Sequence, residues 1–295
     1  MTNHLRRGAG IGALLLLICV SLAAHAQAGH RIFWEVKGRS NTLYLLGSVH
    51  MLKPEDSILP AEVLDAYERS RALVMELDLN DVNMESVLGS GMQSALLPEG
   101  QSLEELLGPE LHADLATHSG RLGLEPELME RFQPWFAALL LEQTALGKLG
   151  FESGAGVDEQ LAQRARQDGK PIIALETAEQ QLGFFAGLTM AQQRQYLRAT
   201  LKDLDTEEND AAAMVQAWQR GDTAELESQL RKESAKSPEL FHLLTTDRNR
   251  QWLPKMVGLL AEQQDYLVVV GALHLVGNDG LVELLKAQGF KVTQH

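Results

Sequence analysis

Two hydrophobic runs, one near each end of the chain, lead into the same four-residue signature, Gly-x-x-His. The first signature covers residues 47–50 and the second covers residues 271–274. Runs of aliphatic, aromatic and β-branched residues are typical of parallel strands that are buried on both faces. Because ligands bind beyond the carboxyl ends of such strands, we expect His50 and His274 to share one site. The alternative is that they are two unrelated histidines at the starts of loops.

Two further hydrophobic runs predict strands that end in acidic residues. One run ends at Glu76 and the other at Glu176. The alternation of apolar and polar residues over residues 32–36 predicts a hairpin that leads into the first Gly-x-x-His strand. A short last strand is expected at residues 290–292.

Between the predicted strands, hydrophobic positions recur with a period near 3.6 residues, which is typical of amphipathic helices. Two long helical stretches are expected, at about residues 80–167 and 179–262. We therefore predict a single α/β domain over residues 29–295, with a central sheet and two large helical insertions. The alternative is an α/β core with an independently folding helical domain, although the sequence has no linker rich in Pro, Gly or Ser to support it.

The first 28 residues have the pattern of a cleavable export signal. Arg6 and Arg7 form a basic region, residues 11–22 are apolar, and residues 26–28 read Ala-Gln-Ala. This pattern predicts cleavage after Ala28 and a periplasmic or secreted mature protein. The apolar stretch is short for a membrane span, so we expect no integral membrane segment in the mature chain.

The only cysteine of the chain, Cys19, lies within the predicted signal. The mature protein would therefore contain no disulfide, no thiolate metal ligand and no cysteine nucleophile. The formal net charge of the whole chain is −14, from 40 acidic and 26 basic residues. An acidic chain without a basic stripe argues against nucleic acid as a partner.

The ends of the four predicted strands supply His50, Glu76, Glu176 and His274. Two imidazoles and one carboxylate with an open position form a common catalytic metal site, and the second carboxylate would then move protons. The alternative interpretations are a solvated acid for Glu76 and a helix entrance for Glu176. No HExxH, P-loop, GxSxG or GxGxxG motif is present.

Three polar residues outside the strand ends are also candidates. Arg248 and Asn249 lie in a helical stretch, where an arginine would bind a carboxylate or stabilise an oxyanion. From the residues alone, a solvated helix face is the favoured interpretation of this pair. Asp158 stands at an expected helix N-terminus, where Asp is usually a cap, and a metal or substrate role is the less favoured interpretation.

Together these segments resemble the TraB/GumN family, which includes the Tiki membrane-associated metalloproteases. The resemblance runs from about Phe33 to Val292 and is greatest with the bacterial GumN-type members. It is carried by the two Gly-x-x-His strands, Glu76-Leu-Asp78, Gly156-Val-Asp158, Glu176-Thr177 with Gln180, and Asp247-Arg-Asn249.

The resemblance implies the fold of ChaN and erythromycin esterase, an α/β architecture with helical additions. It also implies metal-dependent proteolysis of a peptide or protein substrate, with manganese or cobalt as the cofactor and zinc as the alternative. The implied metal ligands are His50, His274 and Glu76, and the candidate catalytic residues are Glu76, Glu176, Arg248 and Asn249.

Two functions other than hydrolysis are also compatible with the sequence. A binding protein would sequester a peptide, a metal complex or haem in the periplasm without catalysis. A role in the export of cell-envelope polysaccharide is suggested only by the family association. Aromatic residues make up 5% of the chain, and no aromatic cluster indicates saccharide binding.

Overall fold

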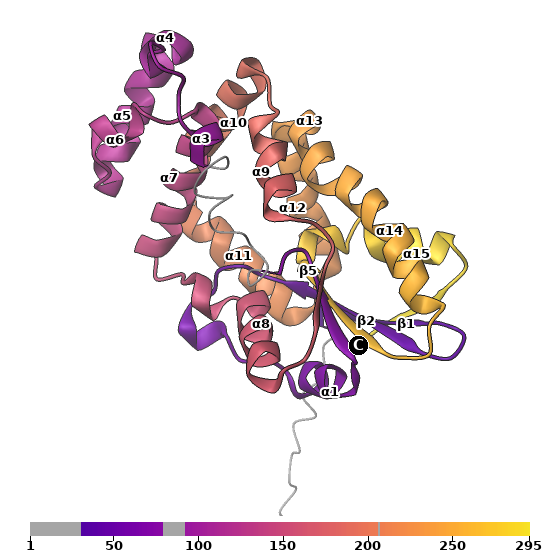
Figure 1. Ribbon diagram of the computed structural model, residues 1–295. Coiled ribbons are helices and arrows are strands. Elements are labelled where there is room, and N and C mark those ends of the chain that lie inside the picture. Colours follow the sequence, from indigo (N-terminus) through magenta and orange to yellow (C-terminus); the bar gives the residue numbers. More distant parts are fainter. Residues whose placement is uncertain (1–30, 79–91, 206) are drawn as a thin grey trace, which may run out of the picture.

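The computed structural model describes residues 31–78, 92–205 and 207–295, so the predicted export signal lies outside the described residues. The described strands form one mixed sheet in the order β4-β3-β5-β2-β1-β6, and helices surround it (Figure 1). The predicted α/β class is therefore confirmed. Within the described part of the chain, no helix is both long enough and apolar enough to cross a membrane.

The sheet combines a parallel centre with an antiparallel edge. Its strands are β1 Phe33–Lys37, β2 Thr42–Ser48, β3 Ala72–Met75, β4 Ile172–Ala174, β5 Tyr266–Gly271 and β6 Lys291–Gln294. Strands β4, β3, β5 and β2 run parallel, and β1 pairs antiparallel with both β2 and β6. The predicted hairpin is thus the β1–β2 pair. Every residue of β2 and β3 is buried, as their continuous hydrophobic runs predict.

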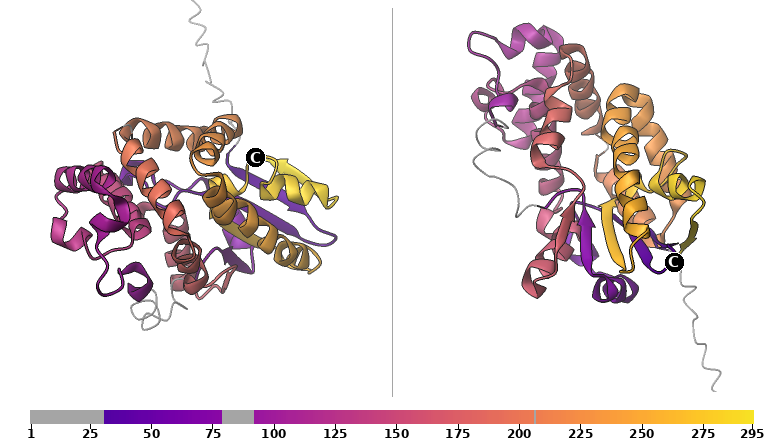
Figure 2. Two further views of the ribbon diagram at one scale, coloured as in Figure 1. Left: turned by 90° about the horizontal axis from the view of Figure 1, so that it is seen from above. Right: turned by 45° about the vertical axis from the view of Figure 1, so that its right-hand side comes forward.

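The helices fall into two groups, one on the sheet and one beyond it. The longer described helices are α1 Ala61–Arg69, α5 Pro109–Leu122, α7 Pro134–Lys148, α8 Val157–Asp168, α9 Ala178–Ala186, α10 Met190–Asp203, α11 Glu207–Arg220, α12 Thr223–Lys236, α14 Asp247–Leu260 and α15 Leu281–Ala287. The shorter ones are α3 Met92–Ala95, α4 Leu103–Leu107, α6 Pro126–Met129 and α13 Pro238–Phe241. Helices α1 and α8 cover one face of the sheet, and α14 and α15 lie on the other (Figure 2).

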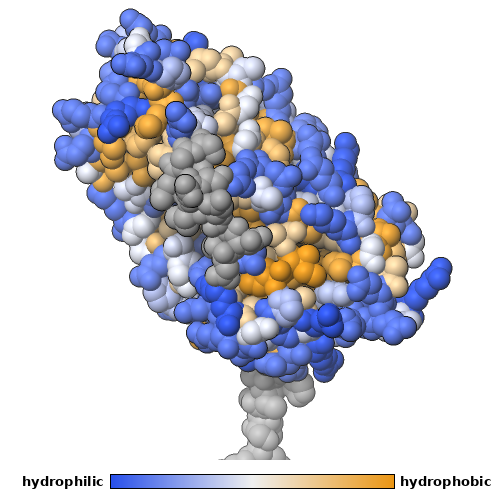
Figure 3. Space-filling model, viewed as in Figure 1, coloured by the Kyte–Doolittle hydropathy of each residue, from blue (hydrophilic) through white to orange (hydrophobic). Residues whose placement is uncertain are grey.

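The helices beyond the carboxyl ends of the strands have hydrophobic cores of their own. Leucines of α4, α5, α7 and α10 form one cluster, which includes Leu103, Leu115, Leu141 and Leu197. A smaller cluster surrounds Trp135. Hydrophilic residues cover the periphery of the face seen in Figure 3, and hydrophobic residues gather nearer its middle.

The strand register decides which residues meet at the carboxyl edge of the sheet. Ser48 at the end of β2 pairs with Gly271 at the end of β5, and Met75 at the end of β3 pairs with Ala174 of β4. The residues that follow these strand ends therefore emerge side by side. This arrangement places the segments after β2, β3, β4 and β5 at one rim, which is where open α/β sheets bind ligands.

The glycine of the first signature has a packing role. A Cβ built on Gly47 would lie 2.2 Å from Cγ2 of Ile32 and 3.0 Å from the backbone Cα of Ala272. The indole of Trp218 donates a hydrogen bond of 2.7 Å to the Gly47 carbonyl oxygen. The close approach of these three segments leaves no room for a side chain, so only glycine fits here.

We predict that Gly47→Ala lowers the free energy of unfolding by at least about 1–3 kcal/mol, because the added methyl group overlaps a buried side chain and a backbone atom. Urea unfolding at pH 7 would measure this change. The matched control is Gly258→Ala in α14, where nothing lies within 4 Å of the added Cβ. That control should be neutral or raise stability by up to about 1 kcal/mol. Equal unfolding midpoints for Gly47→Ala and the wild type would contradict the packing role.

Candidate functional site

Arg248 is the buried centre of the candidate site. It lies in the first turn of α14 and is 8% exposed. Its Nε donates to Oε1 of Glu176 at 3.0 Å, and its Nη2 donates to Oε2 of Glu176 at 2.9 Å and also to Oε2 of Glu76. The two carboxylates are neighbours because they follow the adjacent strands β3 and β4. One guanidinium thus neutralises part of the charge of two buried carboxylates through charge-assisted hydrogen bonds.

Asn249, the next residue of α14, sets the proton position on His274. The Asn249 amide nitrogen donates to the carbonyl oxygens of His274 at 3.1 Å and Asp279 at 2.8 Å. The amide oxygen therefore faces the Nδ1 atom of His274, 2.7 Å away, and accepts its proton. This assignment follows from the hydrogen-bond network. It leaves the lone pair on Nε2 of His274, which lies 3.2 Å from Nη1 of Arg248 and accepts a hydrogen bond from it.

The imidazole of His274 is held neutral. Burial lowers the pKa of His274 to about 4, and the charge of Arg248 contributes to the same shift. The ring also packs on the indole of Trp252, with 4.6 Å between the ring centroids. His274 donates its one ring proton to Asn249, so toward the rest of the site it only accepts hydrogen bonds.

Glu76 is held as a carboxylate. Burial by itself would raise the pKa of Glu76, but its neighbours His274, Arg248 and His50 lower it to about 2. Arg248 is the permanent positive charge among these neighbours. Oε1 of Glu76 also accepts a hydrogen bond of 2.8 Å from the backbone N–H of Gly271. The carboxylate is therefore oriented by groups from β5 and α14 at once.

His50 occupies the open side of the site and pairs with Asp158. Its Nδ1 lies 2.8 Å from Oδ2 of Asp158, and its side chain is 62% exposed. The hydrogen bond to Asp158 raises the pKa of His50 to about 9. Asp158 lies in the first turn of α8, and Gly156 before it allows this approach, because a Cβ there would lie 2.2 Å from the His50 carbonyl oxygen.

His50, Glu76 and His274 face one common space beside Gly271. A Cβ built on Gly271 would lie 3.4 Å from Oε1 of Glu76, 3.5 Å from Cδ2 of His274 and 3.7 Å from Nε2 of His50. The missing side chain of Gly271 thus leaves room for a small group among two imidazoles and one carboxylate. The two signatures of the sequence meet at this point, although they lie at opposite ends of the chain.

The space opens into a cavity of about 800 Å³. His50, Glu76 and Asp158 line it together with apolar side chains such as Met51, Met75, Leu77, Ala162 and Val269. Of the two predicted strand-end acids, Glu76 lines this cavity, whereas Glu176 lies behind Arg248 and is 5% exposed. A cavity of this size, lined by both polar and apolar side chains, suits a segment of a larger ligand.

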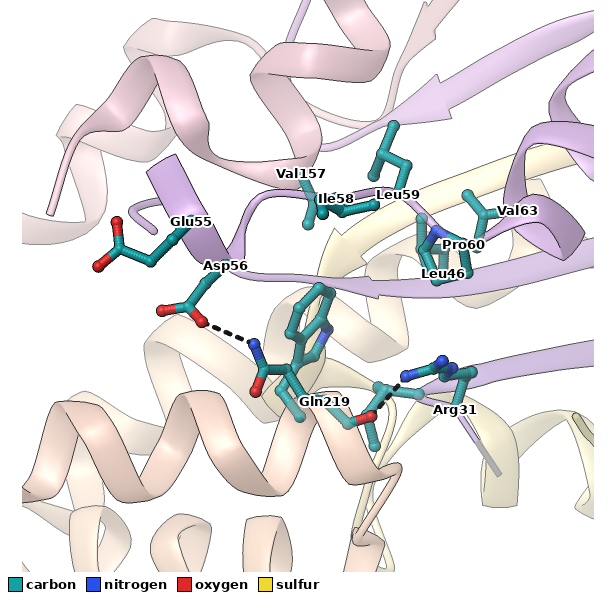
Figure 4. A pocket seen from close by; sticks show the side chains of 12 residues that line it. Arg31, Leu46, Glu55, Asp56, Ile58, Leu59, Pro60, Val63, Val157 and Gln219 are labelled. Atoms are coloured by element: carbon teal, nitrogen blue, oxygen red, sulfur yellow. Dashed lines mark hydrogen bonds between the residues drawn. The ribbon is translucent and has the colours of Figure 1, made fainter. Parts of the chain in front are cut away.

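A second cavity, of about 400 Å³, lies beside the first signature and contains none of the predicted site residues (Figure 4). Its walls are mainly apolar and include Leu46, Val63 and Trp218. Gln219 closes one end through hydrogen bonds, in which its side chain donates to Asp56 and its carbonyl oxygen accepts from Arg31. This cavity is separate from the chemistry of the strand ends.

Two interpretations favoured by the sequence, and one alternative that it left open, are wrong in the structure. Arg248 and Asn249 do not lie on a solvated helix face, since they are 8% and 0% exposed. Asp158 is not the cap of α8, because Gly156 holds that position and the Asp158 carboxylate binds His50 instead. Glu176 is not part of a helix entrance, because Thr177 caps α9 and Glu176 accepts hydrogen bonds from Arg248. In each case the side chain is buried by, or binds to, a segment that is distant in the sequence.

Gln181 is a site residue that the sequence analysis missed. Its amide nitrogen lies 3.2 Å from Oε2 of Glu176 and 3.4 Å from Oε2 of Glu76. The adjacent Gln180, which is part of the family resemblance, instead completes the capping box of α9 with Thr177. The available signal was the spacing of the capping box. It assigns Gln180 to the start of α9, and the next residue, Gln181, then faces the sheet.

Comparisons with known proteins agree with the resemblance seen in the sequence. The model of the TraB/PrgY/gumN family matches residues 32–294. An uncharacterized protein of Escherichia coli, YbaP, is 30% identical over 248 residues, which are 82% of this chain and 87% of that protein. The metalloprotease TIKI1 of Danio rerio is 24% identical over 318 residues, which are 88% of this chain and 62% of that protein. No solved structure matches the chain significantly.

The name metalloprotease implies a metal ion, and the donor types at the site fit one. Both imidazoles are oriented through Nδ1, by Asp158 and Asn249, and the ring atoms nearest the space beside Gly271 are Nε2 of His50 and Cδ2 of His274. Metal-ligating histidines are usually held in this way. In the residues that the structure describes, however, no three His, Cys, Asp or Glu side chains are grouped closely enough to hold a metal ion. Arg248 occupies Nε2 of His274, so a cation would have to displace that contact.

We predict that Arg248→Met lowers the free energy of unfolding by about 3–5 kcal/mol, because it leaves two buried carboxylates without their cation. Arg250→Met is the matched control two residues away. Arg250 is 62% exposed and pairs with Asp279 at 3.1 Å, so its loss should change stability by less than about 1 kcal/mol. Urea unfolding at pH 7 measures both variants. Similar, small effects for the two arginines would refute the central role of Arg248.

We also predict that stability is greatest near pH 6.5. As the pH falls from 6.5 to 4, the unfolded chain takes up a proton on His274, whose ordinary pKa is 6.5, but the folded chain takes it up only near pH 4. Stability therefore falls as the pH is lowered through this interval. His50 has the opposite sign: its contribution is complete below pH 6.5 and is lost as the pH rises to about 9. Urea unfolding from pH 4 to pH 9 would show the maximum.

Imidazole NMR titration tests the same prediction at single residues. We expect His274 to titrate near pH 4 and His50 near pH 9 in the folded protein. Asp158→Asn should return the pKa of His50 toward its ordinary value and remove the loss of stability above pH 6.5. If His274 titrated near pH 6.5, its buried, neutral state would be wrong.

Proposed function

The chain belongs to the TraB/PrgY/gumN family, and from this premise we propose that it is an exported hydrolase that cleaves peptide bonds. The observation that carries the proposal is the common space beside Gly271, where His50, Glu76 and His274 converge at the mouth of the large cavity. The relatives named metalloproteases support this class of reaction. The signal-like pattern of residues 1–28 supports a periplasmic or secreted location.

The protonation states of the site assign the roles of its residues. Asp158 keeps the ring of His50 oriented through Nδ1, and in the metal-free site His50 carries a second proton at neutral pH, which a cation would have to displace from Nε2. Arg248 and the Gly271 N–H hold the Glu76 carboxylate in position. Asn249 keeps the Nδ1 proton on His274, which leaves the lone pair on Nε2.

None of these groups by itself has a pKa and a free lone pair suited to removing a proton from water at neutral pH. Glu76 has a pKa of about 2, so it is a weak base, and the lone pair of His274 already accepts a hydrogen bond from Arg248. A general base works best when its pKa is near the working pH. This mismatch supports the metal-dependent form of the proposal, because a bound divalent cation lowers the pKa of water and polarises a carbonyl group.

We propose that His50, Glu76 and His274 would hold that cation, with manganese or cobalt favoured by the family resemblance and zinc as the alternative. Arg248 would give up Nε2 of His274 and keep its hydrogen bonds to Glu176, which also accepts from Trp252 at 2.9 Å. Glu176 then serves as the fixed anchor of the arginine. The fold resemblance to ChaN and erythromycin esterase also remains a proposal.

The test of the proposed function compares metal content and cleavage in three proteins. Purified mature wild type, His50→Ala and the double variant His50→Ala/His274→Ala are dialysed against trace manganese, cobalt and zinc. We expect about one metal ion per chain in the wild type and none in the double variant. Cleavage of an internally quenched peptide library should fall by at least about 10–100-fold in His50→Ala, the range for weakening a metal site.

His112→Ala is the matched control, because His112 pairs with Glu130 in the helical region away from the cavity. It should retain both metal and activity. Unimpaired cleavage by the folded double variant would refute the proposal. Saturable peptide binding without any cleaved product would favour the alternative of a periplasmic binding protein.

A further inference from the structure

Ser48 carries a buried hydroxyl group without a partner at the candidate site. It is the last residue of β2 and is 3% exposed. It lines the same cavity as His50 and Glu76. Its Oγ atom is buried and has no hydrogen-bond partner among the described residues. Because a buried polar group without a partner costs free energy, such a group needs an explanation.

No hydrogen bond within the described protein explains why position 48 is a serine. In the second signature the residue after the glycine is Ala272, which begins a short 3-10 helix, whereas Ser48 is still part of β2. Ala272 is 2% exposed and packs well there. The hydroxyl of Ser48 thus adds a buried polar atom for which the described protein interior provides no partner.

The position of Ser48 relates the hydroxyl to the reacting space. Ser48 pairs in register with Gly271, whose N–H binds Glu76 and whose missing side chain forms the common space. A second buried atom without a partner, Oδ1 of Asp158, belongs to the same cavity. Two such atoms in one cavity indicate that the ligand supplies their partners.

We propose that the Ser48 hydroxyl is a substrate-binding group that donates a hydrogen bond to the carbonyl oxygen of the bond to be cleaved. This inference rests on the proposed hydrolase function. A serine hydroxyl has one proton and two lone pairs, and in Ser48 no described acceptor takes that proton. Two other donors near this point are engaged: the Gly271 N–H binds Glu76, and Gln181 lies between the two carboxylates. The Ser48 hydroxyl is a donor that no described protein group uses, and it suits the oxygen on which negative charge develops.

The role differs from that of a serine nucleophile. Ser48 has no hydrogen bond to His50 or to any other described residue, so no described base is placed to remove the serine proton. The hydroxyl keeps its proton throughout, and no covalent bond to Ser48 forms. The expected effect is on the reaction rate, because the hydrogen bond strengthens as charge accumulates on the carbonyl oxygen.

The test uses Ser48→Ala, Ser48→Thr and a control serine in the full mature protein. Ser119 in α5 is the control, because it is 0% exposed and its Oγ also has no partner among the described residues, but α5 (Figure 1) contributes no residue to the cavity wall. Each variant is measured by urea unfolding and by steady-state cleavage of the quenched peptide library. A fluorophosphonate probe followed by intact mass measurement detects any nucleophilic serine.

We expect Ser48→Ala to be at least as stable as the wild type and to lose about 10²-fold in kcat, the range for removal of one oxyanion donor. Ser48→Thr keeps the hydroxyl and should recover most of the rate. Ser119→Ala should likewise keep or gain stability, with kcat unchanged. The fluorophosphonate should leave Ser48 unlabelled.

Four results would overturn the inference. These are full activity of Ser48→Ala, a clear loss of its stability, no recovery in Ser48→Thr, and a covalent adduct on Ser48. If the wild type cleaves no peptide, the proposed function itself fails. The unfolding measurement on Ser48→Ala then still tests whether the hydroxyl has a partner within the protein. A less stable Ser48→Ala would then show a structural partner and refute the inference, whereas equal or greater stability would support an unsatisfied, ligand-facing group.

Discussion

The charge of Arg248 is the constraint on which the candidate site depends. A buried carboxylate is stable only when a matched cation and hydrogen bonds replace its water, and here one guanidinium serves both Glu76 and Glu176. The same group donates to His274, which stays neutral and keeps its proton on the side of Asn249. One arginine at the start of α14 thus contacts both carboxylates and the buried imidazole of the rim.

The fold divides the site into a buried half and an open half. Arg248, Glu176 and Asn249 belong to the buried half, where α14 packs against the strand ends and water is excluded. His50 and Asp158 belong to the open half, at the cavity beside α8. Glu76 connects them. A rigid anchor behind an accessible imidazole is a suitable arrangement for chemistry, because the anchor holds the reacting groups in position while a ligand enters from the open side.

Several parts of this arrangement could be predicted from the sequence. The hydrophobic runs indicated the buried parallel strands, and the residues that end these runs, His50, Glu76 and His274, do meet at one rim. The burial of Arg248 could not be predicted, because a helical segment with charged residues looks solvated unless the opposite carboxylates are known. The pairing of Asp158 with His50 was missed for the same reason: capping is a local rule, and a residue 108 positions away overrides it.

The sequence alone determined where strands form and which side chains stand at their ends, because the period of hydrophobic residues acts over a few neighbouring positions. Only the tertiary structure decided how these side chains ionise and which of them face the cavity. The pKa of about 9 for His50 and of about 4 for His274 arises in two copies of the same signature. The difference comes from their surroundings, the carboxylate of Asp158 for His50 and burial for His274, and these surroundings are set by segments that are far apart in the chain.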